Sequence, residues 1–438
     1  LWRFMGFVPD QLDATLWDEL EPLYEDLVGR SLDSVAQLEN MIKDESELRE
    51  WVSEAGSRLY VAMTCSTEDD DKKSAYLDFV ENVEPKLSAI GDCLNRRIMD
   101  SPVIDELDQD KYGVMIRDIR ADIEIFREEN IPLFTELTNK AQKFGEISAQ
   151  MMVQVDGKDQ TLQQASVHLK SIDRDKRKGV FELINERRTE DQTSLDVLLD
   201  ELISKRQELA RNANFENFRD YKFQAMGRFD YTKEDCFDFH NSIEKEIVPL
   251  IADIHKERKT LLGVEVLKPW DMQVDPNGNE PLKPFDGGKE LIDKSIKCFY
   301  RLRPYFGECL EIMKSMKHLD LESKEGKAPG GFNYPLYEIG VPFIYMNAVG
   351  SQRDLVTMVH EGGHAVHSFL SRDLDLCEFK SVPSEVAELA SMAMELLSME
   401  AWDEFYTDEQ ELKRAKREQM EKVLEGLPWI AAIDKFQQ

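Results

Sequence analysis

The chain has 438 residues, 42% of them hydrophobic, which suffices for about three average domains, or fewer if the fold is large and helical. Acidic side chains outnumber basic ones by 87 to 55, and the formal net charge of −32 argues against nucleic acid or an anionic membrane as the main partner, because both bind basic surfaces. The 22 glycines and 16 prolines are too few for a collagen, a low-complexity chain or a loop-rich β protein. No apolar run approaches the roughly 18 residues that a membrane-spanning helix needs.

Helix is predicted almost without interruption from Gln11 to about Lys259. Apolar residues recur there at the i, i+3, i+4 spacing of one helix face. Acidic residues separate the apolar positions of the first stripe, which are Leu12, Leu16, Leu20, Leu23 and Leu27. We see no fixed-period repeat, which argues against a solenoid.

Two segments rich in glycine and proline follow. Residues 264–288 are predicted to form loop or hairpin, after which a helix is expected from Gly288 to about His318. Residues 326–350 hold five glycines, and the best strand candidate of the chain, Pro342 to Ala348, lies among them. A glycine-rich strand in a helical protein suggests backbone that is accessible to a ligand.

The cysteines favour a cytosolic setting. All six are spread singly, without a CxxC pair, as expected for reduced and mostly buried thiols. The first residues lack the basic start, apolar stretch and small-residue cleavage site of a signal peptide. We therefore expect a cytoplasmic protein.

Residues 357–370 hold three of the seven histidines and predict a metal site. His360 and His364 are one helical turn apart, so both imidazoles can share one metal ion. Glu361 lies beside the first histidine, where it can act as general base on a water molecule. His367 lies on nearly the same helix face but a full turn further along, so we expect it to pack behind the ligands and not to bind the metal.

A second helix, predicted over residues 383–400, supplies the third ligand that a catalytic zinc ion needs. Carboxylates are costly on an apolar face unless they are paired or bind a metal. Glu388 is our choice of ligand, and Glu395, seven residues later, is expected to orient a histidine. Glu385 is expected to serve the start of the helix, where an acidic side chain is favourable. Gly362 and Gly363, unfavourable inside a helix, indicate close approach of metal, substrate or a packed neighbour.

The sequence resembles the thimet oligopeptidase and oligoendopeptidase F family of zinc metallopeptidases, and the oligoendopeptidase F branch most. The family pattern is HExGH followed by a helix with E-x-x-S-x-x-x-E, and residues 360–364 and 388–395 match both parts. Weaker similarity covers residues 156–158, 226–231 and 326–332. The resemblance extends from about residue 140 to 400, whereas the first 140 residues match only in helical character.

This resemblance implies an all-α fold with a small β element beside the active site, shaped as a bowl with a deep channel that admits oligopeptides and excludes folded proteins. We expect a helical N-terminal domain over residues 1–140 and a catalytic helical domain over residues 141–438. In the family a C-terminal helical segment carries tyrosines and a histidine that stabilise the oxyanion. No histidine follows His367 and Tyr406 is the one later tyrosine, so the C-terminal part of the catalytic domain is expected to be incomplete.

The expected function is that of a zinc metalloendopeptidase acting on internal bonds of short oligopeptides. One Zn²⁺ ion, held by His360, His364 and Glu388, would activate a water molecule whose proton Glu361 transfers to the leaving amine. The strand over 343–348 either pairs with extended substrate or is an ordinary buried strand with its turn. Candidate substrate contacts in and before this strand are Gly330, Gly331, Tyr345 and Asn347.

Two alternatives remain open from the sequence. A helical zinc carboxypeptidase would need a basic residue for the substrate's C-terminal carboxylate, and Lys327 and Arg353 flank the site in sequence. A catalytically silent, peptide-binding scaffold would keep zinc structurally, but structural zinc usually has four protein ligands and Cys377 is the one cysteine nearby.

Overall fold

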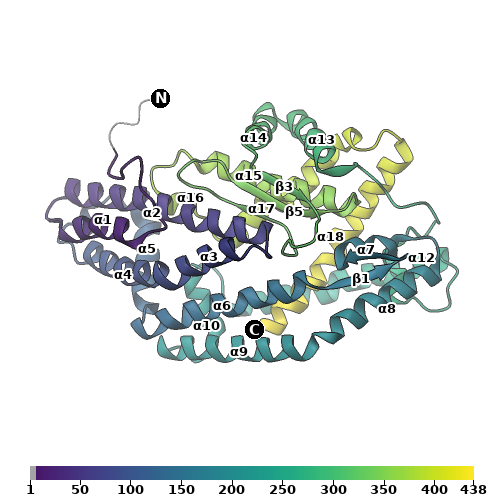
Figure 1. Cartoon of the computed structure of the whole chain (residues 1–438), viewed down its shortest axis with the longest axis horizontal. Coiled ribbons are helices and arrows are strands. Elements are labelled where there is room, and N and C mark those ends of the chain that lie inside the picture. The colour runs from purple at the N-terminus through teal and green to yellow at the C-terminus, as the bar shows by residue number, and fades with distance from the viewer. Residues whose placement is uncertain (1–5) are drawn as a thin grey trace.

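The computed structural model describes residues 6–438 and confirms the mainly helical fold (Figure 1). The N-terminal helices pack around their own hydrophobic core, in which Leu20, Leu38 and Tyr112 are fully buried. These helices are α1 (Trp17–Gly29), α2 (Val35–Cys65), α3 (Asp70–Asn82), α4 (Glu84–Met99) and α5 (Gln109–Ile125).

The middle of the chain forms a second set of helices, which lies along one side of the molecule (Figure 1). It comprises α6 (Ile131–Ala149), α7 (Leu162–Ser166), α8 (Arg174–Glu190), α9 (Gln192–Asn212), α10 (Phe218–Ala225), α11 (Lys233–Ser242), a π-helical turn (Ile243–Ile247) and α12 (Val248–Leu261).

A hairpin interrupts these helices where the sequence predicts continuous helix. Strand β1 (Met152–Val155) pairs antiparallel with β2 (Lys158–Thr161). The two residues between them, Asp156 and Gly157, have φ of 52° and 74°, the left-handed conformation that a tight two-residue hairpin turn requires. The expectation of unbroken helix was wrong here because apolar residues alternate along β1, with Val153 and Val155 buried.

The last part of the chain carries the predicted site. Its helices are α13 (Gly287–Leu302), α14 (Pro304–Ser315), α15 (Gln352–Ser371), α16 (Cys377–Lys380), α17 (Ser384–Leu397), a 3-10 segment (Ser398–Glu404) and α18 (Glu409–Gln437). The single helix expected from Gly288 to His318 is divided at Arg303, because Pro304 lacks the N–H that would continue the first helix and begins the second.

A three-stranded sheet of order β3-β5-β4 lies beside α15. The predicted strand is confirmed as β5 (Phe343–Ala348), and it is the central strand. It pairs parallel with β3 (Leu319–Glu322) and antiparallel with β4 (Phe332–Tyr334), with Tyr345 opposite Phe332. Both edges of β5 are therefore occupied within the sheet, and the strand with an unpaired edge towards the site is β4.

The segment between α15 and α17 ties the site to the N-terminal helices. Leu376 is fully buried in the core of α1–α5. The amide of Cys377 donates to Ser46 Oγ at 2.6 Å, and Lys380 Nζ lies 2.6 Å from Glu50 Oε1. Among residues 6–438 no helix combines the length and apolar character that crossing a bilayer requires.

Candidate metal centre

Helix α15 holds the two histidines in a rigid, well-capped frame. Ser351 accepts a hydrogen bond from the amide of Asp354, whose carboxylate accepts one from the amide of Ser351 in return, so that the helix start is satisfied on both sides. One turn apart on this helix, the rings of His360 and His364 lie 4.9 Å apart between centroids and almost perpendicular, at 86°.

The two glycines between the histidines let neighbouring elements approach α15. A Cβ atom on Gly363 would lie 2.8 Å from the Cα of Ser391 and 2.9 Å from the carbonyl oxygen of Ala390, both in the backbone of α17. A Cβ atom on Gly362 would lie 2.6 Å from the ring of Phe299 in α13. Of the three causes considered from the sequence, a packed neighbour is the one that the structure shows.

Because α17 lies so close, Glu388 faces both histidines. Its carboxylate oxygens lie 3.4 Å from His360 Nε2 and 3.6 Å from His364 Nε2, and one ligand atom from each of the three residues lies within 4.8 Å of the others. Two ligands of a tetrahedral zinc ion, each at about 2.1 Å, stand about 3.4 Å from each other. The donor set of two imidazoles and one carboxylate, with these separations, fits a zinc ion that keeps an open coordination position.

A second layer of hydrogen bonds orients these side chains. His360 Nδ1 lies 2.7 Å from Glu395 Oε1, and the other carboxylate oxygen of Glu395 accepts a bond of 2.8 Å from Gln419 on α18. Ser391 donates to Glu388 Oε2 at 3.0 Å. Burial alone would lower the pKa of His360, but the bond to Glu395 and the charge of Glu361 raise it above its ordinary value. Sequence reasoning missed Gln419, since a single glutamine on a long amphipathic helix gives no signal.

Glu361 lies in the wall of a cavity of about 410 Å³ beside the two histidines. Its side chain is 6% exposed, and burial raises its pKa against the opposing charges of His360 and His364. The cavity is bordered by Gly331 and Asn333 at the β4 side, with His367 among its other lining residues. His367 is absent from the metal-ligating group found in residues 6–438.

The four predicted substrate contacts differ in position. Gly331 borders the cavity, and Gly330 has a φ of 108°, which favours glycine. A Cβ atom on Gly331 would lie 3.3 Å from the carbonyl oxygen of Tyr345, so the packing of the sheet already explains this glycine.

The other two predicted contacts support the sheet. Tyr345 is only 1% exposed, and its hydroxyl lies within hydrogen-bonding distance of the carbonyl oxygens of Thr64 and Ala328, so this hydroxyl is already occupied within the protein. Asn347 donates to the carbonyl oxygens of Ala328 and Gly330 and so holds the loop before β4 in place.

Two further residues that the sequence singled out, Lys327 and Tyr406, are buried and already hydrogen-bonded. The ammonium of Lys327 donates to Asp320 Oδ1 at 2.9 Å, to Glu322 O at 2.9 Å and to Met346 O at 2.6 Å. Burial lowers the pKa of Lys327, against the effect of Asp320. Tyr406 is buried and donates its hydroxyl to Gln352, so it is not available to a substrate.

The first turn of α17 is anchored by residues of the segment 226–231, for which the sequence predicted no role. Arg228 Nε lies 2.5 Å from Glu385 Oε1, and the hydroxyl of Tyr231 donates to the same carboxylate oxygen. Phe223 supports both partners, since its ring lies 5.2 Å from the guanidinium of Arg228 and 5.7 Å from the ring of Tyr231. Glu385 precedes Glu388 by three residues, so this anchor fixes the helix turn that carries the candidate ligand.

Replacing Arg228 by glutamine should weaken zinc binding up to about fivefold, because a half-exposed ion pair contributes at most about 1 kcal/mol. Competition with a chelator of known affinity measures the change. Arg117→Gln is the matched control, since Arg117 contacts Phe229 and Asp230 in the same loop. Equal losses in the two variants would contradict a role for the Glu385 anchor.

The mainly helical frame, with two histidines one turn apart facing a glutamate on a second helix, has the architecture of a helical metallopeptidase. The family model for peptidase family M3 matches residues 167–287 and 311–438, and the model for the peptidase M3 N-terminal domain matches residues 11–126. The chain belongs to peptidase family M3, and the resemblance to oligoendopeptidase F is confirmed.

This chain matches only part of the length of its sequence relatives. An oligoendopeptidase F homolog of Borreliella burgdorferi is 25% identical over 297 residues, which are 67% of this chain and 47% of that protein. Oligopeptidase PepF of Bacillus subtilis is 24% identical over 233 residues, 52% of this chain and 33% of that protein. The chain thus matches less than half the length of either relative.

Solved structures share the fold over nearly the whole chain. PZ peptidase A, solved with an inhibitor, gives a TM-score of 0.92 at 24% identity over 99% of this chain and 76% of that one. A protein assigned as an oligoendopeptidase F from Bacillus anthracis gives 0.92 at 23% identity over 100% of this chain and 80% of that one. At such identities the likeness concerns the fold alone.

Proposed function

We propose that the protein is a zinc metalloendopeptidase that hydrolyses internal peptide bonds of short oligopeptides. The observation that carries the proposal is the convergence of His360, His364 and Glu388 beside a cavity whose wall holds Glu361. Membership in peptidase family M3 and the oligopeptidase names of the relatives support the substrate class.

In this proposal each side chain of the site has a separate role. His360, His364 and Glu388 would hold one zinc ion, which supplies Lewis acidity for the attacking water and the scissile carbonyl. Glu361 accepts the proton of the attacking water and delivers it to the leaving amine. Glu395 fixes the ring orientation of His360, and Gln419 in turn fixes Glu395.

The peptide would lie along the edge of β4, which replaces β5 as the proposed substrate strand. An extended chain can add to an unpaired strand edge through main-chain hydrogen bonds, which gives affinity with little side-chain selection. Asn333 on β4 supports this placement, because its buried side-chain amide nitrogen has no hydrogen-bond partner among the described residues and the residue lines the cavity.

The cavity favours internal cleavage over a carboxypeptidase. Lys327, one of the two basic residues considered from the sequence, is buried and its ammonium is occupied. Lys380 does line the cavity, but it is paired with Glu50. A carboxypeptidase would need an unpaired cation for the terminal carboxylate. The amide of Cys377 bonds to Ser46 on α2, and within residues 6–438 Cys377 is not in the group of ligand atoms that converge with the two histidines, which also speaks against a closed, structural zinc site.

Hydrolysis of a short, internally quenched peptide that is blocked at both ends tests the proposal. The zinc-loaded protein should cleave it at an internal bond, as mass spectrometry of the fragments would show. A chelator should abolish the activity and added zinc should restore it. A carboxypeptidase would leave the blocked peptide intact, and a silent scaffold would cleave neither this peptide nor an unblocked one.

A further inference from the structure

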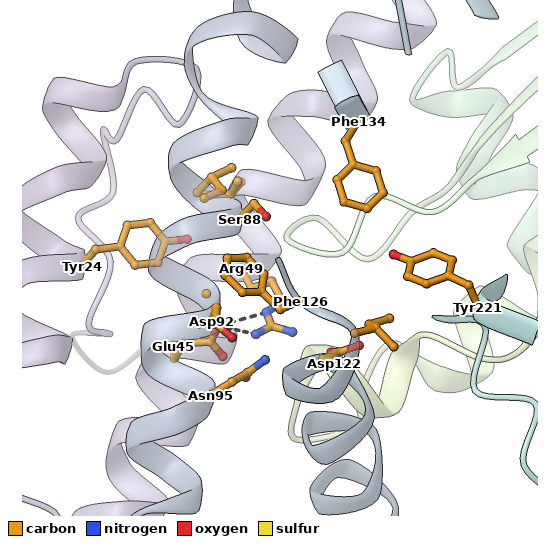
Figure 2. Close-up of a pocket in the computed structure, with 14 residues that line it drawn as sticks. Tyr24, Glu45, Arg49, Ser88, Asp92, Asn95, Asp122, Phe126, Phe134 and Tyr221 are labelled. Atoms are coloured by element: carbon orange, nitrogen blue, oxygen red, sulfur yellow. Dashed lines mark hydrogen bonds and ion pairs between the residues drawn. The ribbon is translucent and has the colours of Figure 1, made fainter. Parts of the chain in front are cut away.

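A second cavity, of about 420 Å³, lies apart from the metal centre and shares no lining residue with the cavity beside it. It is lined by residues of α1, α2, α4 and α5 of the N-terminal bundle and by Phe134 on α6 and Tyr221 on α10 (Figure 2). A molecule bound there would contact both the bundle and the helices of the middle region.

Two buried phenols point into this cavity. Tyr24 is 6% and Tyr221 4% exposed, and no hydrogen bond from either hydroxyl is seen among residues 6–438. Figure 2 shows both hydroxyl groups directed towards the space between them. Both hydroxyl groups therefore open onto the cavity and can donate to, or accept from, a polar group bound there.

The charge around the cavity is negative. Three carboxylates, of Glu45, Asp92 and Asp122, line it against the single guanidinium of Arg49. Arg49 is already paired with Glu45 and with Glu378, which lies outside the lining. Two charged partners lie outside the lining: Glu378, which pairs with Arg49, and Arg96, which pairs with the second oxygen of Asp92. Their charges are opposite, so including them leaves the net charge negative.

Two of these carboxylates retain capacity for a cation. Oδ1 of Asp92 is buried and lacks a hydrogen-bond partner among the described residues. Asp122 forms no ion pair within residues 6–438, although Arg49 and Asp118 influence it, and burial raises its pKa. A carboxylate beside buried phenols gains most from a positively charged donor, because charge-assisted hydrogen bonds are about twice as strong as neutral ones.

We propose that this cavity binds an alkylammonium group, with the ammonium bonded to Asp122 and to the hydroxyl of Tyr221 and its carbon chain packed against the rings. Phe126 and Phe134 supply apolar ring faces beside the polar groups (Figure 2). An ammonium gains further from aromatic faces through cation–π attraction. The group belongs either to a free aliphatic amine or to a lysine side chain of a peptide, and both present the same chemistry.

Calorimetric titration of the whole protein with cadaverine, with a blocked lysyl tripeptide and with neutral pentanol tests this site. At least one of the two amines should bind, and pentanol should bind at least about tenfold more weakly, because it lacks the charge. Asp122→Asn should weaken amine binding about tenfold or more, and Tyr221→Phe a few-fold. Asp110→Asn is the matched control, since it removes the same charge on the exposed first turn of α5, outside the cavity lining.

Binding of cadaverine alone assigns the cavity to free amines, and binding of the tripeptide that Asp122→Asn abolishes assigns it to a lysine side chain. Either result supports the proposal. Three results would overturn it: no binding of either amine, equal binding of pentanol, or unchanged amine affinity in both Asp122→Asn and Tyr221→Phe. The Tyr221→Phe variant keeps the buried ring, so it reports on the hydroxyl even if Asp122→Asn destabilises the fold.

Discussion

Glu361→Gln should lower kcat/KM for peptide hydrolysis by a factor on the order of 10² to 10⁴, the usual contribution of a general base. Glutamine keeps the size of the side chain and its place in the cavity wall but cannot accept the proton of water. Because Glu361 is not one of the three candidate ligands, the variant should retain the zinc content of the wild type.

The matched control for this experiment is Glu182→Gln, which makes the same change on the exposed face of α8. It should cleave as the wild type does. Wild-type turnover in Glu361→Gln would exclude the proposed base. Loss of both zinc and turnover would instead assign Glu361 to metal binding, which the geometry does not favour.

Gly363→Ala should weaken zinc binding at least about tenfold and lower the free energy of unfolding by about 1–3 kcal/mol, the usual cost of overpacking a well-packed interior. The added methyl group would meet two backbone atoms of α17, at 2.8 Å and 2.9 Å, and the Cβ of Met394 at 2.9 Å. Carbon atoms in contact prefer about 3.5–4.0 Å. Backbone cannot rotate away as a flexible side chain can, so α17 must move outward and carry Glu388 away from the histidines.

Gly179→Ala supplies the control, because Gly179 lies within α8 and a Cβ atom there would meet nothing within 4 Å. That variant should gain stability, by up to about 1 kcal/mol, from the better helix propensity of alanine. Thermal or urea unfolding gives both stabilities, and chelator competition gives both zinc affinities. If Gly363→Ala bound zinc as tightly as Gly179→Ala, close packing of α17 would not be what positions Glu388.

Local sequence patterns predicted the parts of the site that lie on single helices. The spacing of His360 and His364, and the carboxylates of Glu388 and Glu395 on an apolar helix, depend only on the 3.6-residue period. The partners of a strand are set by distant segments, and so the central position of β5 and the burial of Tyr345 could not be read from residues 342–348. Arg228 contacts the first turn of α17, and Gln419 bonds to Glu395. Both come from remote parts of the chain, and no local pattern marks them.

Two local signals in the sequence mark features that helical periodicity alone does not predict. Asp156-Gly157 between alternating apolar residues is a strong hairpin signal, and Pro304 marks the start of a second helix. The domain boundary at residue 140 and a cytoplasmic location stay predictions. A boundary at residue 140 would assign Leu376 and Cys377 to the catalytic domain. Both residues nevertheless contact the N-terminal helices, since Leu376 lies in their core and the amide of Cys377 bonds to Ser46.

The zinc content of the dialysed protein tests the central claim most directly, namely that His360, His364 and Glu388 hold one zinc ion. Elemental analysis should find about one zinc ion per wild-type chain and per Glu182→Gln chain. Glu388→Gln should bind zinc at least about a hundredfold more weakly, since even the loss of an outer hydrogen-bond partner costs 10- to 100-fold. Wild-type zinc content and affinity in Glu388→Gln would contradict the assignment of the third ligand and the mechanism built on it.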